Sequence, residues 1–420
     1  MASSALPIPE APTPAVPRPR VSLRPGLVWV HRVAGLTTAL FLLLAGLTGS
    51  LLAFHEEIDR ALNPTAYDAT ARGLPLSPEA LARAVEAGDP RRQVWYITLE
   101  RQEGHAALVV AMGKADPATG APYALTSDWF NVDPVSGAVL AERLWGECCF
   151  GPLNFIPFIY EFHHNLSLPG AIGVVFMGVV AIIWLVDGFV GLALTFPRGR
   201  PFLAKWRPAF RIKGGSAFRL NLDLHRAAGL WLFVFLILIA ITSVSMNLRS
   251  EVVEPVVGLF SKVTPPPFSG APLAQLRERT VSYDAALDAG LREAEDRGWR
   301  GPPSEIFYSP QYGIFGVAFG DHNDPMGANW LYLSGDQATP IGAMVPGAGT
   351  AGDIFMQLQF PIHSGRILGL PGRILIAAMG VLIAMLSVTG IIIWWKKRAG
   401  RKSRSAKASQ TKPASGTAYP

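Results

Sequence analysis

The sequence predicts an α-helical membrane protein with four transmembrane helices in a two-fold repeat and two small α+β domains outside the membrane. Half of the 420 residues are hydrophobic and only 16 % are charged, which is too apolar for a pair of soluble domains. Four apolar runs are each long enough to cross about 30 Å of hydrocarbon at about 1.5 Å per residue. These runs are residues 27–54, 169–196, 222–248 and 371–395.

The distribution of charge predicts the topology. The loop 197–224 contains seven Lys or Arg against one Asp, and the tail after Trp395 contains eight basic residues and no acidic residue. Acidic residues outnumber basic ones by fifteen to eight in 56–162 and by thirteen to seven in 249–362. The positive-inside rule therefore places both termini in the cytoplasm and both domains outside a bacterial inner membrane. The net charge of +6 is the sum of these regions, so it does not indicate nucleic-acid binding.

The segments between the spans differ in composition. Residues 1–26 are proline-rich and predict a disordered cytoplasmic tail, and residues 396–420 predict a second, basic one. Between the spans lie a first α+β domain (55–168), a basic cytoplasmic loop (197–221) and a second α+β domain (249–370).

Both domains are predicted to begin with a helix and to continue with strands. Ser77 is a suitable N-cap with Pro78 at the first helical position, and Val281 opens the corresponding helix of the second domain. The expected strands of the first domain are 94–99, 106–112 and a hairpin over 129–140 that turns at Asp133-Pro-Val-Ser-Gly137. Those of the second domain are 305–309, 314–319 and 330–333. This order predicts a repeat of helix, α+β domain and helix.

Histidines mark the ends of the apolar runs. The first and third runs open with His31-Arg-Val-Ala-Gly-Leu36 and His225-Arg-Ala-Ala-Gly-Leu230. Each of these two motifs places an imidazole about one turn inside a bilayer surface, where an unpaired ring nitrogen is costly to desolvate. Because the two helices are parallel in the repeat, the rings share one depth near the cytoplasmic face. Two such rings satisfy each other only through something between them, which we predict to be haem iron.

A second histidine pair is predicted near the outer face. His363 heads the fourth span, and either His163 or His164 heads the second; we prefer His163. His55 ends the first span at the same face, but the equivalent position of the repeat is Arg249. The remaining two histidines are expected to be ordinary surface residues: His105 and His322.

The predicted cofactor is haem b, with two groups per chain. Since no Cys-x-x-Cys-His is present, attachment is expected to be non-covalent. The arginines beside the histidines are suited to pair with haem propionates: Arg32, Arg226, Arg366 and Arg373. The competing interpretations are histidines that face lipid headgroups, and a zinc or copper site, which would need a closer cluster of ligands. Cys148 and Cys149 are interpreted as small loop residues rather than a vicinal disulfide.

Each span also carries a small or polar pair late in its course. These pairs are Thr48-Gly49, Asp187-Gly188, Thr242-Ser243 and Thr389-Gly390. Helix packing and room for a flat macrocycle explain them equally well. His31 and Thr48 are seventeen residues apart, or about 25 Å along a helix, so two haems near opposite faces would cover most of the apolar layer.

Taken together, the histidine motifs and their neighbours resemble the PepSY-associated transmembrane family over about residues 25–398. The resemblance is carried by both His-Arg-x-x-Gly-Leu words, His55-Glu-Glu-Ile-Asp59, Phe162-His163-x-Asn-Leu and Ile362-His363-Ser-Gly-Arg. Val132-Asp-Pro-Val-Ser-Gly-Ala-Val139 is similar to the hairpin of PepSY domains. The resemblance implies PepSY-like periplasmic domains and a di-haem carrier that reduces a metal chelate, such as a ferric siderophore, on the outer side.

The expected function is therefore electron transfer across the inner membrane to a ferric siderophore or another metal complex held between the outer domains. Aromatic residues suited to line that cleft are Trp129, Trp145, Phe150, Phe155 and Tyr160. The loop 197–224 is too short for a flavin or nicotinamide domain, so a separate donor is expected, either quinol or a cytosolic reductase. The alternatives are a non-enzymatic anchor that binds or restrains a periplasmic partner, and a metal or siderophore transporter that uses Asp187 as a relay.

Overall fold

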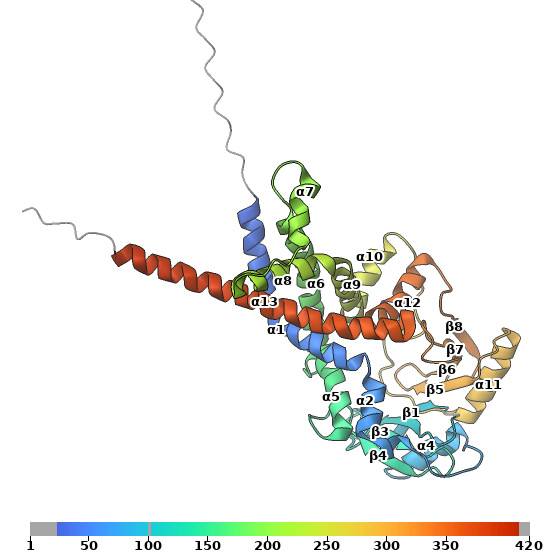
Figure 1. Ribbon diagram of the computed structural model, residues 1–420. Helices are drawn as coiled ribbons and strands as arrows, with labels where there is room; N and C mark the ends of the chain where they lie inside the picture. Colours follow the sequence, from blue (N-terminus) through green and yellow to red (C-terminus); the bar gives the residue numbers. More distant parts are fainter. Residues whose placement is uncertain (1–22, 100–101, 411–420) are drawn as a thin grey trace, which may run out of the picture.

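The computed structural model describes residues 23–99 and 102–410, in which a bundle of long helices lies beside one β-sheet (Figure 1). Among the described residues, three helices are apolar and long enough to cross a membrane, or four spans if a bent pair counts as one. The bundle consists of α1 (Arg24–Leu52), α6 (Ala171–Thr195), α8 (Ala217–Trp231), α9 (Phe233–Asn247) and α13 (Gly369–Gln410). Helix α1 packs along α13 and α6, while α9 packs on α6 and α8 packs on α13.

Close packing of α1 on α13 depends on two glycines. A Cβ added to Gly46 would lie 2.5 Å from the carbonyl oxygen of Gly380, and one added to Gly380 would lie 2.2 Å from that of Gly46. The two backbones therefore approach so closely that no larger side chain fits between them.

Two of the predicted spans differ from expectation. The third span is not one straight helix, because α8 and α9 meet at 70° around Leu232. The two helices also differ in composition. Helix α8 contains Asp223, which is fully buried and bonded to Arg219 and Arg226, whereas α9 carries no charged residue. The fourth helix continues past Trp395 to Gln410, so the start of the expected disordered tail is helical, while residues 1–22 and 411–420 lie outside the described residues.

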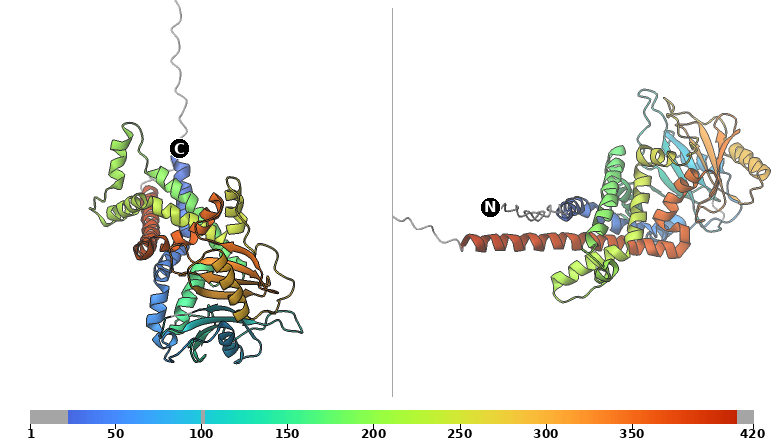
Figure 2. Two further views of the ribbon diagram at one scale, coloured as in Figure 1. Left: turned by 90° about the vertical axis from the view of Figure 1, so that its right-hand side faces the viewer. Right: turned by 90° about the horizontal axis from the view of Figure 1, so that it is seen from above.

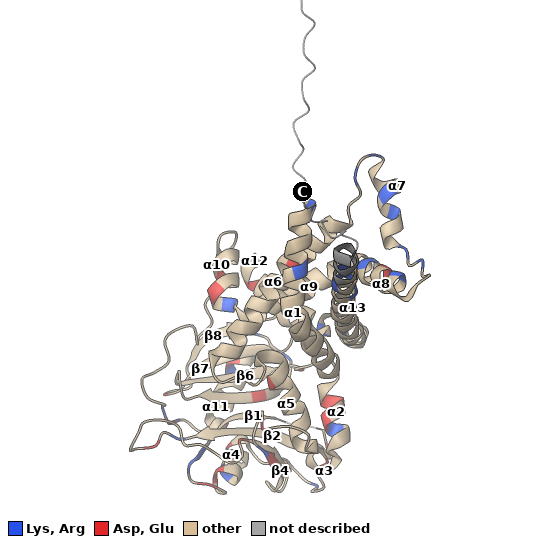
Figure 3. Ribbon diagram, turned by 90° about the vertical axis from the view of Figure 1, so that its left-hand side faces the viewer, with Lys and Arg blue, Asp and Glu red and all other residues tan. Residues whose placement is uncertain are grey.

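Basic residues gather at the end of the bundle away from the sheet. Figure 3 shows Lys and Arg on α7 (Phe202–Trp206) and α8. A 3₁₀ turn, Arg207–Phe210, follows α7, and Arg226 donates to the carbonyl of Ala209 in that turn at 3.1 Å. This contact fastens α8 to the basic loop.

The strands form one antiparallel sheet of eight, in the order β4-β3-β2-β1-β5-β6-β7-β8. The strands of the first half are β1 (Arg92–Thr98), β2 (Ala107–Gly113), β3 (Trp129–Val132) and β4 (Val139–Arg143). Those of the second half are β5 (Pro303–Ser309), β6 (Ile314–Phe319), β7 (Asn329–Ser334) and β8 (Pro340–Met344). The predicted strands and the hairpin are confirmed, while β8 was not predicted.

The two expected domains are joined edge to edge rather than separated by a cleft. Strand β1 pairs with β5, with Tyr96 opposite Phe307 and Thr98 opposite Glu305. Each of these strands would otherwise expose a row of unpaired backbone groups. The pairing satisfies those groups and joins the two expected domains into one sheet.

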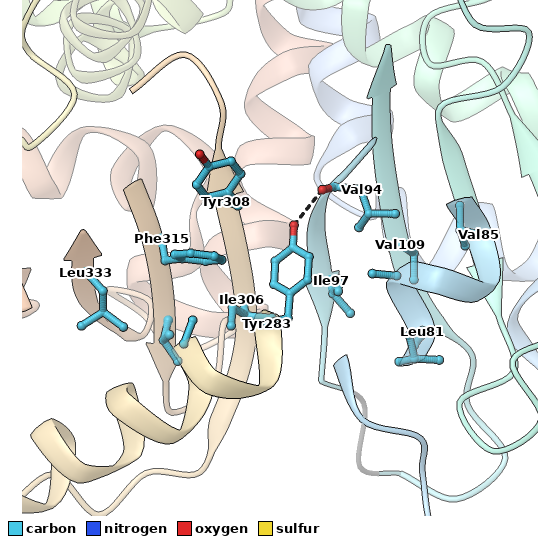
Figure 4. Packing of buried hydrophobic residues seen from close by; sticks show 14 of the residues in the cluster. Leu81, Val85, Val94, Ile97, Val109, Tyr283, Ile306, Tyr308, Phe315 and Leu333 are labelled. Atoms are coloured by element: carbon cyan, nitrogen blue, oxygen red, sulfur yellow. Dashed lines mark hydrogen bonds between the residues drawn. The ribbon is translucent and has the colours of Figure 1, made fainter. Parts of the chain in front are cut away.

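Two helices cover the face of the sheet that points away from the bundle, α4 (Pro78–Glu86) and α11 (Tyr283–Asp296) (Figures 1 and 2). The predicted cap is confirmed, since Ser77 accepts from the N–H of Ala80. The core beneath contains fully buried side chains from both halves, as Figure 4 shows: Leu81, Val85, Val94, Ile97, Val109, Tyr283, Ile306, Tyr308, Phe315 and Leu333. The hydroxyl of Tyr283 donates to the carbonyl of Val94 at 2.7 Å, so the core is shared across the join.

The first turns of α4 and α11 cap each other. The carboxylate of Glu79 accepts from the N–H of Tyr283 at 3.0 Å and from Arg279 at 2.7 Å, while Asp284 accepts from the N–H of Glu79 at 3.0 Å. Burial raises the pKa of Glu79, but the hydrogen bonds from Tyr283 and Arg279 outweigh it, so the pKa lies below its ordinary value. Negative charge at both helix N-termini is favourable, which stabilises the join.

Short helices connect the sheet to the bundle. They are α2 (His55–Leu62), α3 (Pro64–Tyr67), α5 (Pro152–Asn165), α10 (Glu254–Gly258) and α12 (Ala351–Ser364), with a π turn at Arg249–Val253 and a 3₁₀ turn at Arg366–Leu368. A buried ion pair fixes α2 to β4, since Arg143 lies 2.8 Å from Asp59 and also donates to the carbonyl of Leu153 in α5. In the second half, Asp353 completes a capping box with Thr350 at the start of α12.

Candidate cofactor site: two histidine pairs

The structure brings four of the predicted histidines together as two pairs. His31 on α1 and His225 on α8 form the tail-side pair, near the basic loop, with ring centroids 6.2 Å apart and planes tilted by 55°. His163 on α5 and His363 on α12 form the sheet-side pair, with centroids 6.3 Å apart and a tilt of 56°. The two pairs therefore have nearly the same geometry, although they lie on different elements.

In the sheet-side pair, each ring is held through Nδ1 by a threonine of a neighbouring helix. Thr48 lies 2.9 Å from Nδ1 of His163, and Thr242 lies 3.0 Å from Nδ1 of His363. Each threonine hydroxyl lies within bonding distance of a carbonyl one turn earlier in its own helix, Leu44 for Thr48 and Leu238 for Thr242. Its single proton is therefore used, and it accepts from the ring.

The tail-side pair follows the same plan with one difference. His225 Nδ1 lies 3.0 Å from the hydroxyl of Thr389 and 3.1 Å from the carbonyl of Leu386. His31 Nδ1 lies 2.9 and 3.0 Å from the two carboxylate oxygens of Asp187. Carbonyl and carboxylate oxygens only accept, so Nδ1 carries the proton in both rings.

The hydrogen-bond partners favour the same tautomer for all four rings. With Nδ1 protonated, Nε2 of each neutral imidazole has a lone pair free for a metal ion. A metal–imidazole bond of about 2.0–2.1 Å, with each centroid about 1.1 Å behind its nitrogen, places two opposed centroids roughly 6.2–6.4 Å apart. Both observed separations, 6.2 and 6.3 Å, fall in this range. Each pair of rings therefore has the centroid separation that one metal between two imidazoles requires.

Glycines leave room beside three of the rings. A Cβ added to Gly49 would lie 3.0 Å from Cε1 of His163. The corresponding distances are 3.2 Å from Gly390 to His225 and 3.4 Å from Gly191 to His31. Small residues are therefore needed at Gly49 and Gly390, whereas an added Cβ at Gly191 would make an ordinary contact. The two tight positions favour a role at the site over general helix packing.

The sheet-side pair lines a cavity between the helices. Its inner wall is apolar and includes Leu42, Met177, Trp184, Ile239, Ile376 and Ile383. Its rim is polar and aromatic, with His55, His164, Tyr160, Arg366 and Arg373. An apolar slot with a charged rim suits a flat macrocycle that carries carboxylates on one edge. Two histidines are enough for such a group, and among the described residues no cluster of three or more His, Cys, Asp or Glu is arranged to hold a bare ion.

A known protein family matches the chain. The family described as PepSY-associated TM region matches residues 28–397, most of the chain. The chain belongs to the PepSY-TM family. No curated protein matches the sequence.

Three of the four arginines predicted for this PepSY-TM protein form ion pairs with acidic residues. Arg366 lies 3.0 Å from Glu56, and Arg373 lies 2.6 Å from Glu57. Both also line the sheet-side cavity, where the carboxylates of a ligand would compete with these glutamates. On the tail side, Arg226 pairs with Asp223 and Arg32 is exposed.

The sequence suggested that the histidines of the sheet-side pair head the second and fourth transmembrane helices, but they do not. His163 and His363 lie in the last turn of α5 and α12, before each chain turns into α6 and α13. His164 lines the cavity but is not part of the ring pair, and His55 begins α2 instead of ending α1. His322 is exposed, as expected of a surface residue, and it lies 2.9 Å from the buried carboxylate of Glu305. Cys148 and Cys149 lie in the loop between β4 and α5, where small loop residues were expected.

The hydrogen-bond partners of the rings are the residues that sequence reasoning missed. Thr48, Thr242, Thr389 and Asp187 stood out in the sequence only as small or polar pairs. A usable signal was present, because His31 and Thr48 are separated by the same seventeen positions as His225 and Thr242. Such a shared spacing indicates that each outgoing helix contributes one ring and one ring partner.

Proposed function

We propose that this PepSY-TM protein is a di-haem b electron carrier of the inner membrane and acts as a ferric-chelate reductase. One observation carries the proposal: two pairs of imidazoles, each with Nδ1 hydrogen-bonded and centroids 6.2 or 6.3 Å apart. Paired neutral imidazoles opposed across one metal are the axial ligands of many haem proteins. Haem iron, when bound, supplies a reversible one-electron couple.

The protein residues hold and orient the ligands. Thr48 and Thr242 fix the rings of the sheet-side pair, and Asp187 and Thr389 fix those of the tail-side pair. Partners of this kind set the ring orientation and the tautomer, and their loss costs typically 10–100-fold in metal affinity. The apolar wall of the sheet-side cavity would keep water from the ligands.

Helix α1 supports a path across the apolar layer. It contributes His31 to the tail-side pair and Thr48 to the sheet-side pair, which are about 25 Å apart along the helix. We propose that electrons enter at the tail side from quinol or a cytosolic reductase and leave at the sheet side. The matching helix and strand order of the two halves supports an origin of this path in a two-fold repeat.

The proposed acceptor is a ferric siderophore or another metal chelate in the periplasm. Because β1 and β5 join the two domains into one sheet, we propose that the acceptor approaches the rim of the sheet-side cavity. Tyr160 and Arg366 lie on that rim and offer an aromatic surface and a cation.

The test is a spectrum of the purified protein in detergent. After expression in haem-replete cells, we expect a reduced-minus-oxidised spectrum of b-type haem and about two haems per chain. A colourless, folded protein would contradict the proposal. It would favour a non-enzymatic anchor in which the sheet binds a periplasmic partner.

A further inference from the structure

The four ring partners are not chemically equal, and the difference is confined to one position. Three rings are held by threonine hydroxyls, whereas His31 is held by the carboxylate of Asp187. Thr389 occupies the corresponding place for His225, the other ring of the same pair. The side chain of Asp187 is 10 % exposed, so its charge acts in a medium of low polarity.

The negative charge of Asp187 is not neutralised by a basic side chain of the described residues, unlike that of a second buried acid, Asp223. Asp223 on α8 is neutralised by Arg219 and Arg226, at 2.9 and 2.8 Å. Across the part of the chain that the structure describes, no Lys or Arg forms an ion pair with Asp187, whose carboxylate is directed at His31. The natural recipient of its negative charge is therefore the imidazole and whatever that imidazole binds.

We propose that Asp187 is a positioning residue that lowers the reduction potential of the tail-side haem through His31; the inference rests on the proposed function. A carboxylate that accepts from Nδ1–H draws the proton toward itself and increases the electron density at Nε2. A more basic Nε2 stabilises the oxidised, more positive iron relative to the reduced one. The neutral hydroxyls at the other three rings give less of this effect. The tail-side haem is thereby the stronger reductant, and electron flow toward the sheet side is downhill.

The experiment is an optical redox titration of the full-length holoprotein in detergent. Asp187→Asn keeps the shape of the side chain and removes its charge. We expect the lower of the two midpoint potentials to rise while the other stays unchanged, with haem content still about two per chain. Thr389→Asp places a carboxylate on the second ring of the same pair, and we expect it to shift the same midpoint downward.

The outcomes separate the two proposals. If the wild-type protein carries no haem, the proposed function fails. If it carries two haems and Asp187→Asn leaves both midpoints unchanged, only the role of Asp187 is overturned. If Asp187→Asn loses the tail-side haem, two other variants decide. Asp187→Thr copies the arrangement at His225, and Thr389→Asp retains Asp187. If neither variant shifts the midpoint potential of the tail-side haem, the inference is overturned. The near-infrared band of bis-imidazole haem checks that ligation is intact in every variant.

Discussion

The tail-side and sheet-side pairs share one ring geometry but differ in their surroundings. Their centroid separations are 6.2 and 6.3 Å, and their tilts are 55° and 56°. The sheet-side pair lines a cavity with a polar rim, and both of its rings are held by threonines. The tail-side pair lies near buried Asp223 and has a carboxylate on one ring. The comparison teaches that the helix scaffold sets the same ring geometry at both pairs, while the neighbouring residues differ between the proposed entry site and the proposed exit site.

The largest expected effect tests whether the two histidine pairs form independent haem sites. His31→Ala or His225→Ala is expected to remove the tail-side haem, and His363→Ala the sheet-side haem, so that each variant retains about one haem of two. The reason is that each change removes one of two axial ligands at a site about 25 Å from the other along α1. Haem content per chain measures this result. Loss of both haems from a folded single variant would show that the pairs do not form separate sites.

Adjacent histidines give a matched pair of variants for the sheet side. His163 belongs to the ring pair with His363, and His164 lines the same cavity without joining that pair. We expect His163→Ala to lose the sheet-side haem and His164→Ala to keep it with, at most, a shifted potential. Adjacent helical residues point about 100° apart, so they do not substitute for each other. Retention of haem in His163→Ala would reassign the ligand.

Glycine substitutions sharpen the comparison with smaller effects. Gly49→Ala brings a Cβ to 3.0 Å from His163, Gly390→Ala to 3.2 Å from His225, and Gly191→Ala to 3.4 Å from His31. Crowding of this kind costs about 1–3 kcal/mol at the tightest position and less as the distance increases. Haem occupancy should therefore fall most at the sheet side, in Gly49→Ala, and least in Gly191→Ala. Gly229 has open space around its Cβ position, so Gly229→Ala is the control and should match the wild type.

The smallest expected effect concerns the sheet close to the sheet-side site. The ion pair with Glu305 raises the pKa of His322 above its ordinary value of 6.5, and Arg366 acts on the same ring at longer range. The stabilisation is complete below pH 6.5 and is lost as the pH rises through the raised pKa. Because the His322 side chain is 56 % exposed, the effect should be below about 1 kcal/mol. Thermal unfolding across this pH range measures it, and His322→Gln should abolish that part of the pH dependence.

Local signals in the sequence predicted much of the fold. Ser77 and Pro78 identified the start of α4, the Asp133–Gly137 turn identified the β3–β4 hairpin, and 314–319 matches β6. The repeated words at His31 and His225 were enough to predict that these rings share one depth. Each of these features depends on a few neighbouring residues, so it leaves a trace in the local sequence.

The features that were missed depend on contacts between distant segments or conflict with local rules. Helices α5 and α12 contain Pro157 and Pro361, which usually mark a helix end. The β1–β5 join pairs residues about two hundred positions apart, and no local pattern encodes it. Likewise, the bond from Asp187 to His31 links two helices, so the acid stood out in the sequence without its partner.

Helix α1 also acts as a molecular ruler, since one unbroken helix contributes both a ring to the tail-side pair and a ring partner to the sheet-side pair. One residue inserted between His31 and Thr48 would rotate one end against the other by about 100° and lengthen the segment by about 1.5 Å, so both sites would not stay in phase. We expect aligned PepSY-TM sequences to tolerate insertions in the sheet loops and to exclude them from this stretch of α1. The length of a membrane helix, usually set by bilayer thickness, is here also constrained by the angle between two binding sites.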